Sequence, residues 1–394
     1  MKLNKGQENC VDGCSKHLRK SHKQVMEYSG AAGTGKTEVI KEIARRSRLD
    51  IEEEILFLAY TGRAAANISL RGLPGRSMHS ALMNAVEIPK LDDNGNEMYK
   101  HGRKLTTLTF RPKAYLPRQV KALFIDEGSF VDTEMGNVAL SFGLPIIVAG
   151  DLDQLGPIYG DSFFLHDPDY ILTEIMRQKN HYGIIDLATR IRLGGEMPTK
   201  PCQFGDDCFI LRKKDITDTI LVNSEMILCS KNKTRNYYND RVRHDIFGIT
   251  SKLPVRGDKV IVRKNDWNRL LDGTPLTNGT SGYIHSNIHR DEIDIKSGTV
   301  LVDFRPDYSP YDYYAKLPID IDFFLGKCGE KEVNRFNKGI KMELASATTI
   351  HLAQGSQATS VLYDDTDVWG DSDTIRRLRY TAVTRSTDLL IYVI

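Results

Sequence analysis

The stretch GAAGTGKT, residues 30–37, decides the fold, because it matches the pattern of a phosphate-binding loop: Gly, four residues, Gly, Lys, then Ser or Thr. Its glycines allow backbone conformations that bulkier residues avoid, so successive N–H groups can turn inward around phosphate oxygens. Lys36 is expected to reach the β- and γ-phosphates, and Thr37 to bind Mg²⁺ through its hydroxyl. The predicted nucleotide-binding residues of the loop are Gly30, Gly33, Thr34, Gly35, Lys36 and Thr37.

The segments around this loop indicate an α/β domain. An apolar run at 25–28 precedes the loop, and a helix predicted from Thr37 to about Arg46 follows it with its apolar residues on one face. Further apolar runs at 55–60, 122–126 and 145–149 are typical of parallel strands with crossover helices.

A second α/β pattern occupies the rest of the chain. It begins with a strand at 226–229 and resumes with strands at 346–350, 360–363 and 389–393. The segment between these pieces is rich in Asp, Tyr and Pro and indicates a β-rich insertion, while a polar stretch with a turn in the first half indicates a hairpin. The predicted boundaries are 1–82 and 118–182 for the first domain, 83–117 for its hairpin, 183–281 and 344–394 for the second domain, and 282–343 for its insertion.

Composition restricts the class of protein without deciding it. The formal net charge of +2 over 394 residues is nearly neutral, so nucleic acid would have to bind in a local groove. The N-terminus is charged where a signal peptide needs apolar residues, and no apolar run approaches the ~20 residues of a membrane span. We therefore expect no membrane partner and a cytoplasmic location, with the six cysteines reduced.

One cluster near the N-terminus invites two interpretations. Cys10, Cys14, His17 and His22 offer four potential zinc ligands. The two cysteines, however, also fall on one apolar stripe of a helix, and four ligands along one helix project in a row instead of converging. The spacing favours helix packing.

The strand at 122–126 ends in two carboxylates, in LFIDEGS. Asp126 is placed to hold Mg²⁺, and Glu127 to orient and deprotonate an attacking water. The alternative is an exposed acidic turn, but the pair directly follows a strand with a buried pattern. We therefore expect hydrolysis as well as binding.

A second polar loop follows the strand at 145–149, in VAGDLDQLGPI. The neutral amide of Gln154 can contact both a γ-phosphate and the attacking water. Together with GAAGTGKT and IDEGS, this stretch resembles the superfamily 1 helicases of the RecD and Dda branch. The resemblance implies two RecA-like P-loop NTPase domains that bind ATP and Mg²⁺ between them.

The motifs of that family continue in order along nearly the whole chain. The resemblance implies that Gln7 recognises adenine, that Gly355 lies at the nucleotide, and that Arg177 and Arg385, the latter in YTAVTRS, act on the γ-phosphate from across a cleft. It also implies a set of DNA-binding residues: Thr61, Arg63, His79, Asn278 and His351.

The chain departs from the family pattern in two places. Gln357 stands where relatives more often have Thr or Glu, and the insertions give no local match. In relatives a hairpin in the first insertion separates the strands, so Phe110 or Tyr115 is a candidate to stack on the terminal base pair. The alternative is that such an aromatic packs against its own domain.

Three functions fit these residues. The preferred one is a DNA helicase that translocates 5′ to 3′ on single-stranded DNA and opens forked DNA in replication, recombination or repair. We expect it to act as a monomer, with replication or recombination proteins as candidate partners and a phage as the candidate source. The second is a translocase or remodeller of branched DNA with little unwinding. The third is a nucleotide-switched binding module, which the two arginines argue against.

Overall fold

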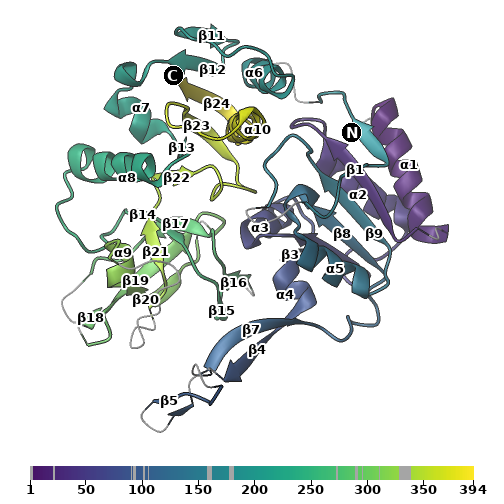
Figure 1. Ribbon diagram of the computed structural model, residues 1–394, viewed down its shortest axis with the longest axis horizontal. Helices are drawn as coiled ribbons and strands as arrows, with labels where there is room; N and C mark the ends of the chain where they lie inside the picture. The colour runs from purple at the N-terminus through teal and green to yellow at the C-terminus, as the bar shows by residue number, and fades with distance from the viewer. Residues whose placement is uncertain are drawn as a thin grey trace.

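The computed structural model describes residues 3–20, 23–89, 91, 95–100, 103–104, 106–157, 162–176, 182–271, 274–288, 292–294, 296–309, 311–327 and 339–394. These residues form two mainly parallel six-stranded sheets, a third sheet that is antiparallel, and smaller hairpins. Figure 1 shows the first α/β domain on the right, the second at the upper left and the third sheet below it, with one hairpin projecting at the bottom.

The first domain is a parallel sheet with helices on both faces. Its strand order is β10-β1-β9-β8-β2-β3. The strands are β1 (Val25–Gly30), β2 (Ile55–Ala59), β3 (Gly75–Ser77), β8 (Ala122–Asp126), β9 (Ile146–Gly150) and β10 (Tyr170–Leu172). The helices are α1 (Lys5–Lys20), α2 (Lys36–Ser47), α3 (Gly62–Leu70), α4 (Met78–Leu82) and α5 (Thr133–Ser141).

Alternation along the strands divides the core of this domain in two. Phe57 and Phe124 pack with α1, α2 and α3, whereas Leu58 and Leu123 pack with α4 and α5 on the opposite face. Both faces of the central strands are therefore buried, which explains why the sequence shows continuous apolar runs there. Cys10 and Cys14 lie in the first of these clusters, as the helix-packing interpretation predicts.

The second domain repeats this plan with a different strand order, β11-β12-β24-β23-β13-β22, in which only the β11–β12 pair is antiparallel. Its strands are β11 (Cys202–Phe204), β12 (Cys208–Leu211), β13 (Met226–Cys229), β22 (Ala347–Thr349), β23 (Ala358–Asp364) and β24 (Ser386–Val393). Helices α6 (Tyr182–Arg192) and α10 (Ser372–Val383) cover one face, and α7 (Asp218–Asn223) and α8 (Asn232–Asp240) the other. The predicted fold class of two α/β domains is confirmed.

The third sheet has the order β18-β19-β17-β14-β21, with β20 paired to β19, and a core of its own. Its strands are β14 (Lys259–Val262), β17 (Ser281–Ile284), β18 (Ile293–Asp294), β19 (Thr299–Pro306), β20 (Tyr314–Asp320) and β21 (Met342–Leu344); α9 (Ile321–Phe324) packs beside them. A small hairpin, β15 (Asp266–Leu271) and β16 (Thr274–Leu276), follows β14. The sheet thus takes in residues before the boundary expected at 282, because β14 pairs with β17 and β21.

The hairpin of the first domain consists of β4 (Met83–Pro89) and β7 (Thr106–Pro112), paired from Met83 with Pro112 to Pro89 with Thr106. A second short pair, β5 (Tyr99–Lys100) and β6 (Arg103–Lys104), lies further out. β4 directly follows α4, so the hairpin leaves the domain at the end of that helix (Figure 1). Within the described ranges, no helix has the length and apolar character needed to cross a membrane.

Candidate nucleotide site and DNA channel

The phosphate-binding loop connects β1, which ends at Gly30, to α2, which begins at Lys36. Gly33 and Gly35 have φ of 83° and 81°, in the left-handed region that favours glycine. A Cβ at Gly35 would lie 2.7 Å from the amide nitrogen of Gln7, so side-chain size is limited there as well. Gly35 is also the N-cap of α2 and supplies no side chain to the first N–H groups of the helix.

Two predicted residues lie beside this loop with partners inside the protein. Lys36 Nζ donates to the carbonyl oxygen of Gly30 at 2.6 Å and lies 4.0 Å from a carboxylate oxygen of Asp151. Gln7, on α1, donates to the carbonyl of Thr34 at 2.9 Å and accepts from the backbone of Asn4. Contact of Gln7 with adenine stays a prediction.

The strand-end carboxylates are half-buried next to the loop. Asp126 accepts a hydrogen bond from the backbone N–H of Glu127 at 2.9 Å, and Glu127 has a φ of 54°. Among the described residues, Glu127 Oε2 has no hydrogen-bond partner. Burial raises the pKa of both carboxyls; the Asp126 carboxylate raises that of Glu127 further, and Lys36 opposes both shifts. An unpartnered carboxylate of raised pKa suits a general base near neutral pH.

Arg71, which the sequence patterns did not single out, reaches into the same place from the C-terminal end of α3. Its guanidinium donates to the Thr37 hydroxyl and, at 3.2 Å, to Oε1 of Gln357 in the second domain. The oxygen atoms of Thr37 and Asp126 line one cavity and are the hard ligands that Mg²⁺ prefers. These residues fit a Mg²⁺ site, and Arg71 would have to release the Thr37 hydroxyl to open it.

Arg385, from the segment after α10, closes this cavity from the opposite domain. Its Nη2 donates to Oε1 of Gln154 at 2.9 Å and its Nη1 to the carbonyl of Ser356 at 3.1 Å. Burial lowers the pKa of Arg385, and Glu127 and Asp151 oppose that shift; an arginine stays charged in any case. The structure thus brings together most of the predicted catalytic residues around a cavity of about 340 Å³, with the predicted metal ligand Thr37 beside them: Lys36, Asp126, Glu127, Gln154 and Arg385.

Besides Gln7, described above, three predicted residues are not brought into that lining, and one cannot be placed. The Gly30 carbonyl accepts from Lys36, and the Thr34 carbonyl accepts from Gln7 on α1. Gly355 packs on α3 instead, where its carbonyl accepts from Asn67 and a Cβ would lie 3.0 Å from that of Ala64. Arg177 falls outside the described residues.

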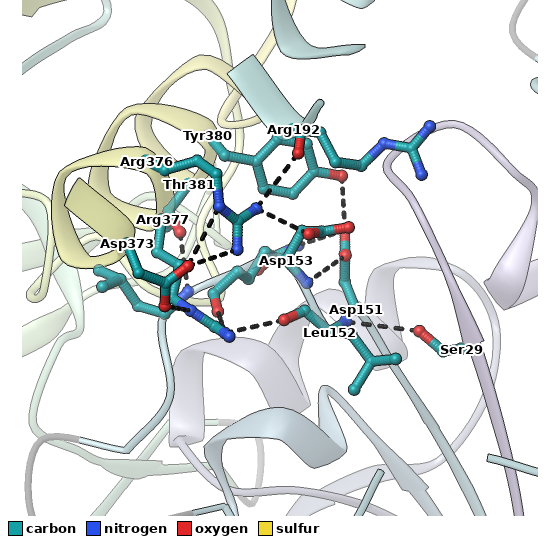
Figure 2. A network of polar contacts seen from close by, with 12 residues as sticks. Ser29, Asp151, Leu152, Asp153, Arg192, Asp373, Arg376, Arg377, Tyr380 and Thr381 are labelled. Carbon is teal, nitrogen blue, oxygen red and sulfur yellow. Dashed lines mark hydrogen bonds and ion pairs between the residues drawn. The ribbon is translucent and has the colours of Figure 1, made fainter. Parts of the chain in front are cut away.

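The face of α10 that meets the first domain is polar. Figure 2 shows Arg376 bonded to Asp153 and Arg377 to the carbonyl of Leu152. Next along the helix, the hydroxyl of Tyr380 donates to Asp151 at 2.8 Å. The loop after β9 is therefore held by the second domain through several charged and polar contacts.

A second cavity, of about 220 Å³, gathers residues predicted to bind DNA. Its lining includes four of them: Thr61, Arg63, Asn278 and His351. Thr61 is the N-cap of α3, Asn278 lies in the turn before β17, and His351 follows β22, so three parts of the fold meet there. Burial lowers the pKa of Arg63 and of His351; the lower pKa keeps this imidazole neutral at pH 7.

The other two predicted DNA contacts lie beside that cavity at the base of the hairpin. The His79 ring meets Tyr60, which lines the cavity, at 5.7 Å and meets Phe110 at 5.9 Å, both edge to face. Phe110 is half-buried against the core of the first domain, as the packing alternative expects, whereas Tyr115 is 82% exposed. Neither aromatic lies in the outer part of the hairpin.

Two α/β domains that face each other across a phosphate-binding loop and an opposing arginine define a two-domain P-loop ATPase. Residues 2–200 match the family model described as AAA domain, and residues 344–393 match the one described as UvrD-like helicase C-terminal domain. The chain belongs to the AAA domain family, and its predicted place among the superfamily 1 helicases is confirmed.

Solved structures share this fold at low sequence identity. The Pif1 helicase from Candida albicans is 17% identical, with a TM-score of 0.54 over 100% of this chain and 95% of that chain. A Bacteroides Pif1 bound to single-stranded DNA is 15% identical, with a TM-score of 0.57, and Pif1 in a structure of DNA unwinding at forked duplex DNA is 16% identical, with a TM-score of 0.56; both alignments cover 100% of this chain and 92% of the other. A comparison with curated proteins gave no match.

Proposed function

We propose that this protein is an ATP-dependent DNA helicase that moves 5′ to 3′ along single-stranded DNA and opens forked duplexes. One observation carries the proposal: the segment 351–357, which follows β22, borders both cavities. His351 and Gln354 line the second cavity, which we propose to be the DNA channel, while Gln357 lines the nucleotide cavity. A change at the nucleotide can therefore move a DNA contact only a few residues away.

The proposed chemistry uses residues of both domains. Lys36 would leave the Gly30 carbonyl to pair with the phosphates, and Glu127 Oε2 would accept a proton from the attacking water. Mg²⁺ held by Thr37 and Asp126 would neutralise charge on the phosphates. Arg385 adds positive charge only while the domains are closed, which ties hydrolysis to domain motion.

The DNA contacts support a motor over a nucleotide switch. Thr61 and Arg63 belong to the first domain and His351 to the second, so closing and opening the nucleotide cleft would move two DNA grips relative to each other. The relatives described as bound to single-stranded DNA and as unwinding forked DNA support the same substrates here. Action as a monomer in replication, recombination or repair is part of the proposal.

The test is strand separation of matched duplexes that carry a single-stranded tail at either the 5′ or the 3′ end, with ATP and Mg²⁺. We expect unwinding only from the 5′ tail. Unwinding only from the 3′ tail would overturn the polarity and keep the motor. DNA-stimulated ATP hydrolysis without strand separation would replace the helicase by a translocase or remodeller.

A further inference from the structure

A buried tyrosine of the second domain sits between two elements of the nucleotide site in the first. The Tyr380 hydroxyl donates to Oδ2 of Asp151 at 2.8 Å and accepts from the backbone N–H of Ala32, in the phosphate-binding loop, at 3.0 Å. Figure 2 shows the ring lying beside Asp151. Only 1% of the Tyr380 side chain is exposed, so water cannot replace either partner.

Asp151 connects this tyrosine to the residues proposed for catalysis. The same oxygen, Oδ2, accepts from the amide nitrogen of Gln154 at 3.3 Å. Because the nitrogen of that amide faces Asp151, its oxygen faces Arg385, which donates to it at 2.9 Å. Hydrogen bonds therefore connect Tyr380 of the second domain, through Asp151 and Gln154 of the first, to Arg385 of the second.

The Tyr380 hydroxyl also affects whether Lys36 pairs with Asp151. Lys36 Nζ lies 4.0 Å from Oδ2 of Asp151, too far for a good hydrogen bond but close enough for attraction. A buried carboxylate that loses a donor is costly, so it will recruit the nearest donor that is not yet bonded to it. Without the Tyr380 hydroxyl, Lys36 is that donor, and it would be drawn away from the phosphates.

We propose that Tyr380 is a positioning residue for ATP hydrolysis: its hydroxyl holds Asp151 so that Gln154 faces the γ-phosphate and Lys36 stays free to bind it. The inference rests on the proposed function and adds a residue that touches no reacting atom. Burial raises the pKa of Tyr380, with Asp151 adding to the shift, so the hydroxyl keeps its proton throughout the neutral range.

The experiment compares Tyr380→Phe with a matched control, Tyr238→Phe. Tyr238 is also 1% exposed and also donates to a buried carboxylate, Asp364, at 2.8 Å, but it lies on α8 away from the cleft. Both variants lose one buried hydroxyl and should lose similar thermal stability. We expect Tyr380→Phe to lower the kcat of DNA-stimulated hydrolysis about tenfold to a hundredfold, and Tyr238→Phe to keep it.

A double-mutant cycle separates positioning from a general loss of order. Because Tyr380 is proposed to act partly through Gln154, Tyr380→Phe should lower kcat clearly less when added to Gln154→Ala than it does in the unsubstituted protein. Multiplying effects would overturn the inference. Asp151→Asn keeps the size of the side chain and should lower kcat by a similar factor, which provides a test even if Tyr380→Phe folds poorly.

The activity of the unsubstituted protein separates failure of the proposed function from failure of the proposed role of Tyr380. If it shows no DNA-stimulated hydrolysis, the proposed function fails and the inference fails with it. If it hydrolyses ATP and Tyr380→Phe matches Tyr238→Phe in kcat, the inference alone is overturned.

Discussion

The two α/β domains share a strand-turn-helix unit but differ in what binds the backbone N–H groups of its turn. In the first, β1 leads through the glycine loop to α2, whose N-terminus has no side-chain cap. In the second, β13 leads to α8, and the N–H groups of Ser230 and Lys231 donate to the two carboxylate oxygens of Asp367, both at 2.9 Å. An internal carboxylate thus occupies the kind of place that a phosphate is proposed to take in the first domain.

This difference shows how two copies of one fold can serve different roles, one at the phosphates and one opposite them. A helix N-terminus attracts an anion through its free N–H groups and its dipole. The first domain leaves the start of α2 without a side-chain partner, whereas in the second domain Asp367 accepts from the two N–H groups directly before α8. The second domain instead faces the nucleotide cavity with Arg385, next to the C-terminal end of α10.

The strongest test removes the cation of the open loop. Lys36→Ala should abolish DNA-stimulated ATP hydrolysis, because nothing else in the loop neutralises the β- and γ-phosphates. Lys41→Ala, which removes a partly exposed lysine on the same helix that pairs with Glu38, should retain activity. Phosphate release measured with and without single-stranded DNA checks both variants, and an unchanged rate in Lys36→Ala would remove the assigned site.

The next test removes the contribution of the second domain. Arg385→Ala should spare ATP binding and slow turnover roughly a thousandfold, because the arginine acts on charge that develops during phosphoryl transfer. Arg379→Ala is the matched control, since Arg379 lies on α10 but pairs with Asp365 inside the second domain. Fluorescent nucleotide binding and single-turnover hydrolysis measure the two steps separately; near-normal turnover in Arg385→Ala would end its proposed role.

Sequence predicts features that a short stretch defines by itself. The glycine loop, the carboxylates after β8 and Gln154 after β9 were found because residue type and strand-end position together specify their chemistry. Contacts between distant segments carry no such pattern: the bond from Ala32 to Tyr380 joins positions 348 residues apart. Arg71 was missed for the same reason, because only the fold brings the end of α3 to Thr37.

Sheet membership was also beyond the local pattern. β14 is an apolar strand like those of the α/β domains, and only its antiparallel pairing with β17 and β21 places it in the third sheet. Similarly, hairpin sequence alone left Phe110 open between a DNA contact and a core position, and the half-buried ring beside His79 depends on how the hairpin base meets α4.

The internal carboxylate of the second domain should contribute to stability. Asp367→Ala leaves the N–H groups of Ser230 and Lys231 without their partner, and we expect the free energy of unfolding to fall by about 1–3 kcal/mol. Asp206→Ala, at an exposed turn residue, should change it by less than about 0.5 kcal/mol. Urea unfolding of both variants measures the difference, and equal stabilities would mean that the turn needs no anion.

The smallest expected change in folding stability is an increase, and it concerns Glu127, the unpartnered carboxylate of the first domain. Burial raises the pKa of Glu127 above the ordinary value of 4.5, so its charged form is less favourable in the folded chain than in the unfolded one. Above pH 4.5 the unfolded chain loses this proton first, and folding stability falls until the pH has passed the raised pKa. Glu127→Gln removes that cost and should raise stability at pH 7 by about 1 kcal/mol, while abolishing hydrolysis.

The same variant should lose its advantage in acid. Below pH 4.5 the carboxyl is protonated in both the folded and the unfolded chain, so Glu127→Gln and the unsubstituted protein should unfold alike. Thermal unfolding at pH 7 and at about pH 4 checks both parts. A variant that is less stable at pH 7 would mean that Glu127 is already compensated by its surroundings. The two domains would then differ only in whether the N–H groups of the strand-turn-helix unit are available to a ligand.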